Sequence, residues 1–255
     1  MKFTKAQKTA IRDKGFVRIP GLVSGPQIRR ALREINKALG RSSSYGKDGM
    51  PREADCQGPW SELKYSPAIS GLFLRSAVKA AVESLIGKGR LDADLQRDVL
   101  IRFPQEASGH ERTSFHIDGF EYGGGLGARN ARSHGHTIAA AVLLSDAPRG
   151  GMGNLTLIPG SHRVLEKYFQ EHPEGVERLE MPSVGLGAPV SVTGMAGDVI
   201  FYHYQVAHSA FARKNLSHDI HYAAIFWAKR IGHEERWREA LTNIWLEWPG
   251  MRDVP

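Results

Sequence analysis

The chain has 255 residues, 41% of them hydrophobic and 24% charged, with a formal net charge of +7 at pH 7. A chain of this length can bury one large core, so we expect a single domain. Its longest apolar stretch, residues 138–144, is too short to cross a bilayer, and its scattered cations form no uninterrupted run of the kind that binds nucleic acid. The positive charge indicates first a solvated surface and second an anionic small-molecule substrate.

Two features of the sequence predict a cytoplasmic location. Cys56 is the one cysteine and cannot form an internal disulfide, which suits a reducing compartment. Residues 1–5 lead into an amphipathic helix and not into the apolar core of a secretory signal. We therefore expect a cytoplasmic protein that is not inserted in a membrane.

The N-terminal part, about residues 1–95, is predicted to be mainly helical. Ser24 and Gln27 have the spacing of a capping box, and apolar residues then recur at helical spacing until Gly40, which we expect to end the helix. These apolar positions are Ile28, Ala31, Leu32, Ile35 and Leu39. Residues 76–86 read as another helix, and residues 41–59 as a long loop of the kind that often serves as a lid.

The next part, about residues 96–228, is predicted to consist of short strands. The strands are predicted over residues 97–103, 113–118, 137–145, 154–158, 190–192, 198–203, 207–211 and 220–227. Short strands without long intervening helices are typical of a jelly roll and not of a parallel α/β sheet. We therefore expect a mainly β, cupin-like jelly roll with flanking α-helices, followed by a C-terminal helix at about 232–246 that packs outside it.

Three residues of the strand-rich part have the chemistry and spacing of a mononuclear iron site. His116 and Asp118 are two apart on one predicted strand, so their side chains project to the same side while Ile117 turns into the packing. His208 lies on a later strand, which a Greek-key path brings beside the first at the same open end. Two histidines and one carboxylate on one face of a metal leave the opposite face open for other ligands.

Further segments around these residues carry a resemblance to a known family. Three segments occur in the same order as in that family. They are residues 13–23, residues 154–162, which end in Pro-Gly-Ser-His, and residues 197–203, which begin with Gly-Asp-Val. With the three candidate ligands, they resemble the phytanoyl-CoA dioxygenase family of iron(II)- and 2-oxoglutarate-dependent oxygenases. The resemblance covers about residues 7–228 and implies the same fold, a double-stranded β-helix.

The resemblance also implies an activity. It implies that His116, Asp118 and His208 bind Fe(II), and that 2-oxoglutarate and dioxygen are used to oxidise an organic substrate, usually by hydroxylation. Related iron halogenases carry a small residue in place of the carboxylate. Because Asp118 is present, halogenation is disfavoured.

One position departs from the family pattern. After Asn215 and Ser217 the family has an arginine that forms a bidentate pair with the far carboxylate of 2-oxoglutarate, but this chain has His221. Imidazole cannot make the same fork. Three explanations stay open. His221 anchors the cosubstrate alone or with help from a hydroxyl such as that of Ser217; Arg102 or Arg213 takes over; or 2-oxoglutarate is not used.

Other motifs carry weaker hypotheses. His203 is interpreted as lying close behind the metal site, His162 as making a structural hydrogen bond, and His136 as part of the segment that leads into the next strand. Residues 123–128 nominally fit a dinucleotide-binding pattern, but no βαβ unit surrounds them. We interpret that segment as a mobile loop, with closure over the substrate as the alternative.

The sequence therefore predicts an iron(II)- and 2-oxoglutarate-dependent dioxygenase that hydroxylates a small or medium-sized organic molecule. Two alternatives are an iron oxygenase or isomerase that needs no 2-oxoacid, and a cupin-like metal-binding protein without turnover. The expected partner is a small molecule and neither nucleic acid nor membrane. The substrate and the oligomeric state cannot be read from the sequence.

Overall fold

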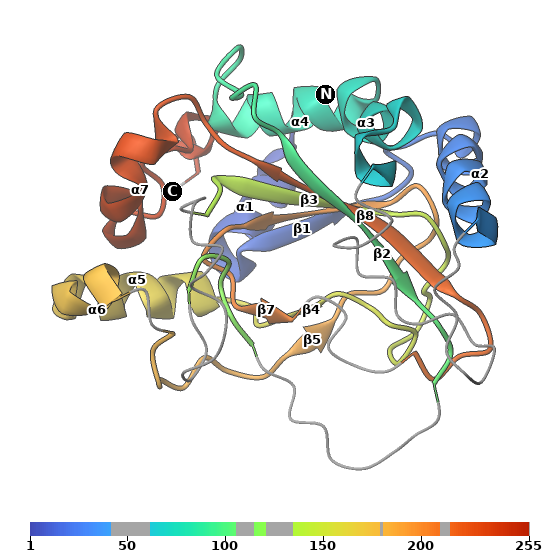
Figure 1. Cartoon of the computed structure of the whole chain (residues 1–255). Coiled ribbons are helices and arrows are strands. Elements are labelled where there is room, and N and C mark those ends of the chain that lie inside the picture. The colour runs from blue at the N-terminus through green and yellow to red at the C-terminus, as the bar shows by residue number, and fades with distance from the viewer. Residues whose placement is uncertain (42–61, 106–114, 121–134, 179–180, 210–214, 255) are drawn as a thin grey trace.

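The computed structural model describes residues 1–41, 62–105, 115–120, 135–178, 181–209 and 215–254. Within these residues two antiparallel sheets lie one above the other, with helices along the outer side and at one end (Figure 1). The larger sheet has the strand order β1-β6-β3-β8-β2, and the smaller has β5-β4-β7. The predicted jelly roll with flanking helices is thereby confirmed.

The strands follow the predicted positions closely. The bounds are β1 Phe16–Ile19, β2 Gln96–Arg102, β3 Ile138–Leu143, β4 Thr156–Leu157, β5 Val190–Ser191, β6 Val199–His203, β7 His208–Ser209 and β8 His221–Ala228. Strand β1, which the periodicity did not indicate, pairs with β6. The predicted strand 113–118 appears as a single antiparallel bridge from His116 to His208, and residues 113–114 lie outside the described part.

The helices include several that the sequence analysis missed. The α-helices are α1 Lys5–Lys14, α2 Gly25–Arg41, α3 Pro67–Leu74, α4 Ala77–Ile86, α5 Ser161–Glu171, α6 Pro173–Arg178 and α7 His233–Thr242, and short 3-10 helices span Leu63–Tyr65 and Pro249–Met251. Helix α2 continues through Gly40 to Arg41, so the expected stop at Gly40 is wrong. Helix α7 ends at Thr242, earlier than predicted. None of the described helices combines the length and the apolar character needed to cross a membrane.

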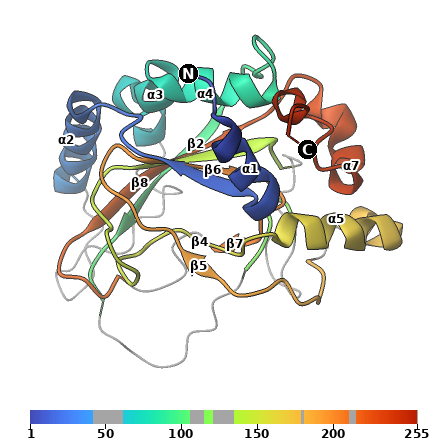
Figure 2. The same ribbon diagram turned by 180° about the vertical axis from the view of Figure 1, so that it is seen from behind.

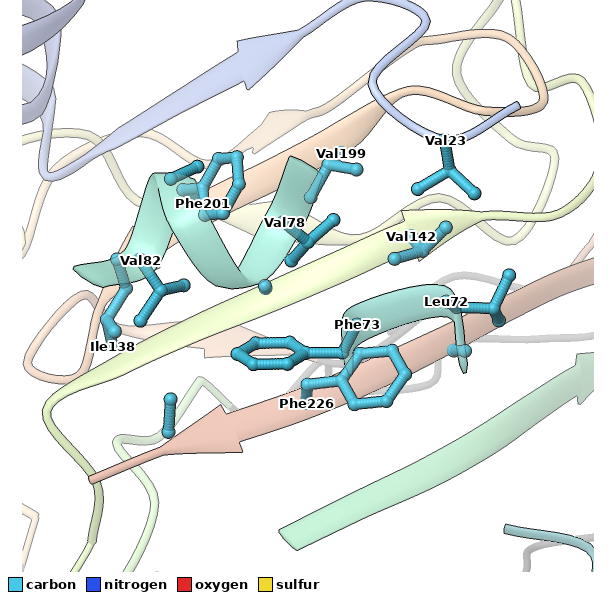
Figure 3. Packing of buried hydrophobic residues seen from close by; sticks show 14 of the residues in the cluster. Val23, Leu72, Phe73, Val78, Val82, Ile138, Val142, Val199, Phe201 and Phe226 are labelled. Carbon is cyan, nitrogen blue, oxygen red and sulfur yellow. The ribbon is translucent and has the colours of Figure 1, made fainter. Parts of the chain in front are cut away.

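The main core lies between the larger sheet and the helices on its outer side (Figures 1 and 2). Figure 3 shows Leu72 and Phe73 of α3 and Val78 of α4 in the same cluster as Val142 and Phe226 of the sheet, with Phe73 next to Phe226. The rings of Phe73 and Phe226 have centroids 5.3 Å apart. Burial of each such side chain contributes about 1.5–3 kcal/mol, which fixes the sheet against its helices.

The opposite face of the same sheet points toward the smaller sheet. On β3 this inner face carries Ala139, Ala141 and Leu143, and on β8 it carries Ala223 and Ile225, all of them buried. They pack with residues of the smaller sheet such as Leu157. Because strand residues alternate between faces, Trp227 and His221 also belong to this inner face. The functional candidates therefore lie between the two sheets.

The turn that leads into β6 is held by a buried carboxylate. Asp198 accepts hydrogen bonds from the backbone N–H of Gly21 at 2.9 Å and of Met195 at 3.0 Å, and it pairs with the Arg18 guanidinium. Burial alone would raise the pKa of Asp198, but these donors hold it below its ordinary value. The carboxylate thus joins the end of β1 to the start of β6.

We predict that Asp198→Asn destabilises the protein by about 1.5–3 kcal/mol, because it removes a charge that accepts buried hydrogen bonds. The contribution is fully present above the ordinary carboxyl pKa and is lost as the pH falls through the lowered pKa of Asp198. Urea unfolding of both proteins at several pH values measures it. Asp94→Asn, at an exposed position, is the control, and equal stability of the two variants would contradict the prediction.

Candidate metal centre

Three side chains predicted from the sequence come together between the sheets. His116, Asp118 and His208 each offer one ligand atom, and these atoms all lie within 4.8 Å of one another. Asp118 Oδ1 lies 3.7 Å from His116 Nε2 and 3.5 Å from His208 Nε2. His208 is buried, whereas the side chains of His116 and Asp118 are 35% and 28% exposed. The three side chains are therefore shielded from solvent on the His208 side and accessible to solvent on the other.

The backbone sets the relative position of the two histidines. His116 and His208 form an antiparallel bridge in which each donates its N–H to the carbonyl of the other, both at 2.9 Å. Residues paired in this way project their side chains to the same face, and the ring centroids lie 4.7 Å apart. Ile117 between the ligands is fully buried among Leu165, Phe169 and other apolar residues, as its strand parity predicted.

The hydrogen bond at the other ring nitrogen of His208 fixes which nitrogen faces Asp118. Nδ1 of His208 lies 3.0 Å from the carbonyl oxygen of Val206, which can only accept, so Nδ1 carries the proton in the neutral ring. Nε2 then presents a lone pair toward Asp118 and His116. Metal-bound histidines use this arrangement, in which one nitrogen donates to a carbonyl and the other ligates.

Electrostatics keep the carboxylate of Asp118 charged. Burial alone would raise its pKa, but His208 and His116 outweigh that effect and hold the pKa of Asp118 well below its ordinary value. The same attraction acts on His208, where burial lowers the pKa but Asp118 raises it above the ordinary value overall. An anionic carboxylate beside two imidazoles is the donor set that attracts a divalent cation.

The spacing of Asp118 from each of the two histidines fits such an ion. Two nitrogen or oxygen donors that each lie about 2.1 Å from a shared ion are at most about 4.2 Å apart. The distances of 3.5 and 3.7 Å from Asp118 to the two histidines fall within this limit. Two nitrogens and one oxygen on one side suit Fe(II) and leave the other coordination positions for exchangeable ligands.

The second oxygen of Asp118 meets residues that the sequence analysis did not select. The indole N–H of Trp227 donates to Asp118 Oδ2 at 2.8 Å. His136 Nδ1 lies 3.7 Å from the same oxygen, and burial lowers the pKa of His136 to about 3. His136 was interpreted as part of a connecting segment. The one signal in the sequence for Trp227 was the alternation of strand residues along β8, which puts its side chain on the same face as that of Ile225.

The structure brings together two of the residues predicted to hold 2-oxoglutarate. Arg102 of β2 and His221 of β8 are direct partners in the antiparallel register, so their side chains lie on the same face. Burial and, to a smaller extent, the charge of Arg102 lower the pKa of His221 to about 4. His221 Nδ1 also lies 3.0 Å from Ser145 Oγ. At neutral pH Arg102 is therefore the cation of this pair.

A glycine of the facing layer leaves room for this pair. Gly153 has a φ of +74°, and a Cβ placed on it would lie 3.1 Å from Arg102 Cβ and 3.5 Å from His221 Cβ. The backbone at Gly153 therefore lies closer to both side chains than the backbone of a residue with a Cβ would.

The other predicted residues have different outcomes. Arg213 and the glycine-rich segment at 123–128 lie outside the described residues. The Ser217 hydroxyl donates to Asn215 Oδ1 at 2.6 Å in the turn before β8, so its visible contacts are within that turn. His162 bonds the carbonyl of Arg12 through Nε2 at 3.1 Å, as expected of a structural residue.

The interpretation of His203 as a neighbour of the metal site is wrong. Its Nε2 lies 2.8 Å from the carbonyl oxygen of Ile244, and its ring stacks on Trp248 with centroids 5.1 Å apart. Neighbouring strand residues alternate between faces, and it is Tyr202 whose ring lies 5.3 Å from that of His208. The parity of β6 therefore turns His203 toward the C-terminal segment.

Comparisons with known proteins place these observations in a wider group. The phytanoyl-CoA dioxygenase family matches residues 11–239. An ectoine dioxygenase from Halomonas elongata is 24% identical over 238 residues, which cover 87% of this chain and 68% of that protein.

Two solved structures illustrate the similarity of fold. The non-heme alpha ketoglutarate dependent carbocyclase SnoK from nogalamycin biosynthesis superposes with a TM-score of 0.58, at 21% identity, over 89% of this chain and 83% of that one. HygX from Streptomyces hygroscopicus, with nickel and 2-oxoglutarate bound, superposes with a TM-score of 0.57 at 17% identity, over 90% of this chain and 88% of that one. At these identities the structures support the fold alone.

The geometry predicts that the protein binds one divalent transition metal at this centre. His208→Ala and Asp118→Ala should each weaken Co²⁺ binding by more than the factor of about 10–100 that loss of an outer partner typically costs, because each removes a ligand. Calorimetric titration measures the change. His172→Ala, which alters a ring stacked on Tyr168 in α5, is the matched control and should bind as the wild type does. Unweakened binding by both ligand variants would refute the assignment.

Proposed function

Because the chain belongs to the phytanoyl-CoA dioxygenase family of iron(II)- and 2-oxoglutarate-dependent oxygenases, we propose that it is a dioxygenase that hydroxylates a small or medium-sized organic molecule. His116, Asp118 and His208 are proposed as the iron ligands. The single observation that carries this proposal is the convergence of their ligand atoms to within 4.8 Å of one another between the two sheets.

Each part of the centre has a role in the proposed reaction. With iron(II) bound, the centre supplies the oxidising chemistry of the family, which consumes 2-oxoglutarate and dioxygen. His208 and His116 would hold the metal through their ring nitrogens, and Asp118 would compensate part of its charge. The buried side of the centre excludes water, and the exposed edges of His116 and Asp118 face the side from which a substrate approaches.

Arg102 is proposed as the residue that binds the far carboxylate of 2-oxoglutarate. The position where the family has an arginine holds His221, whose lowered pKa of about 4 leaves it neutral near pH 7. Arg102 is its direct cross-strand partner, so a guanidinium stands on the same inner face although it comes from a different strand. His221, held by Ser145, is proposed to support this contact with a hydrogen bond and not with a charge.

The location of Arg102 bears on the alternative functions. Loss of the arginine on β8 is the observation that favours an oxygenase or isomerase without 2-oxoacid, or a metal-binding protein without turnover. The guanidinium of Arg102, directly opposite His221 on the adjacent strand, offers a replacement for that arginine, which supports use of 2-oxoglutarate.

The proposed substrate is a small organic molecule. The net charge of +7 favours an anionic one, because a positive surface raises the local concentration of anions. The similarity to an ectoine dioxygenase is consistent with a small polar substrate. Residues 1–255 are proposed to act as a single oxygenase domain.

We predict that the iron-loaded protein binds 2-oxoglutarate without oxygen and releases succinate in air. Anaerobic calorimetry measures the first and chromatographic assay of succinate the second. Asp118→Ala should abolish succinate release, because the metal loses its only carboxylate ligand among the described candidates. A wild-type protein that neither binds 2-oxoglutarate nor forms succinate would defeat the proposed function.

Arg102→Met should weaken binding of 2-oxoglutarate by about 10–100-fold, the equivalent of a lost charge-assisted hydrogen bond of about 1.5–3 kcal/mol. His221→Ala should have a smaller effect. Affinity at saturating metal should be constant between pH 6 and 8, because His221 becomes protonated only as the pH falls toward its pKa of about 4.

The control for this prediction is Arg97→Met. Arg97 lies on the same strand but on the opposite face, where it donates to Ser70 Oγ at 2.6 Å. It should leave the affinity for 2-oxoglutarate unchanged. If His221→Ala weakens binding and Arg102→Met does not, the anchor is His221 and the assignment of Arg102 is wrong.

A further inference from the structure

The two oxygens of Asp118 have separate surroundings. Oδ1 is the oxygen near both candidate histidine ligands, 3.7 Å from His116 Nε2 and 3.5 Å from His208 Nε2. Oδ2 accepts the indole N–H of Trp227 at 2.8 Å. A hydrogen bond accepted by Oδ2 draws electron density from that oxygen and makes it a weaker donor to a cation than Oδ1.

We propose that Trp227 is a positioning residue that holds Asp118 as a ligand through Oδ1 alone. This inference rests on the proposed function, because it concerns the state of one proposed iron ligand. A carboxylate that binds through both oxygens occupies two coordination positions, and one that binds through a single oxygen occupies one. The indole thus preserves a position for an exchangeable ligand.

The sheet register explains why the indole reaches this carboxylate. Trp227 of β8 pairs with Ala139 of β3, which pairs in turn with Tyr202 of β6, so the three side chains form one row on the inner face. Ala139 is small and lies between two large aromatic residues. The Tyr202 ring lies beside that of His208 on one side of Ala139, and the Trp227 indole is bonded to Asp118 on the other side.

Trp227 is better placed for this role than the other neighbour of Oδ2. His136 Nδ1 lies 3.7 Å from Oδ2, beyond hydrogen-bond distance. An indole has one N–H and no acceptor, so it can only donate to the carboxylate and cannot compete for the metal. The position of Trp227 is also fixed by the pairing of β8 with β3, and not by a loop.

Two variants test the inference. Trp227→Phe removes the donor and part of the ring. Replacement of Trp227 by 3-benzothienylalanine keeps the size and shape of the indole and exchanges its N–H for sulfur. Trp245→Phe is the matched control, since this half-buried tryptophan packs against His203 and Trp248, away from Asp118. Circular dichroism and the thermal midpoint establish that each protein is folded.

Each protein is titrated with Co²⁺, followed by calorimetry and by the visible absorption of the bound ion, which depends on coordination number. We expect the Kd for Co²⁺ to rise about 10–100-fold in both Trp227 variants, as for loss of an outer partner of a ligand. We also expect their Co²⁺ spectrum to change, because Asp118 is then able to bind through both oxygens. A merely structural role would lower the thermal midpoint but leave the spectrum of the bound ion unaltered.

The outcomes separate this inference from the proposed function. If the benzothienylalanine protein keeps the wild-type Kd and spectrum, the inference is overturned while the proposed function stands. If the wild type binds Co²⁺ but not 2-oxoglutarate, and the Trp227 variants show the expected changes, the inference holds and the cosubstrate assignment fails. A wild type that binds no Co²⁺ overturns both.

Discussion

The reciprocal pair of backbone hydrogen bonds between His116 and His208 is the constraint on which the candidate centre depends. The two residues are far apart in sequence, and two separate flexible loops would not hold their ligand atoms in a fixed relative position. An antiparallel bridge does so because it fixes both backbones and sends both side chains to one face. Asp118 then follows from its spacing, two residues beyond His116 on the same extended segment.

The charge of Asp118 is the second requirement, since a buried carboxylate without partners would take up a proton. His208 and His116 keep it ionised from one side, and the N–H of Trp227 bonds its other oxygen. These contacts come from three parts of the chain that the two-sheet fold brings together. The fold therefore holds the three candidate ligand side chains together, which reduces the reorganisation that metal binding requires.

The convergence of His116 and Asp118 and most strands could be predicted from the sequence because both have local signals, a spacing of two residues and runs of alternating pattern. His208 has no such local signal and was selected with the help of the family resemblance. Helix α3 was missed because Pro67–Leu74 is almost entirely apolar and shows no helical polar face. Helix α5 was missed because Gly160, with φ of +79°, was interpreted as part of a turn that ends the segment and not as the residue before a helix. The pairing of Arg102 with His221 has no local signal, since it arises from the register of two distant strands.

The central strand β3 has faces with opposite tolerances to a change in side-chain size. On its outer face, Ile138 and Val142 fill the space under the helices, so shortening them would leave voids. On its inner face, Ala139 and Ala141 are fully buried. Lengthening Ala139 would drive atoms toward Tyr202 and Trp227, and lengthening Ala141 would drive atoms toward Ile200 and Ile225. Even one carbon added to the inner face of β3 would therefore disturb the packing between the two sheets, whereas the outer face is sensitive to the loss of a carbon.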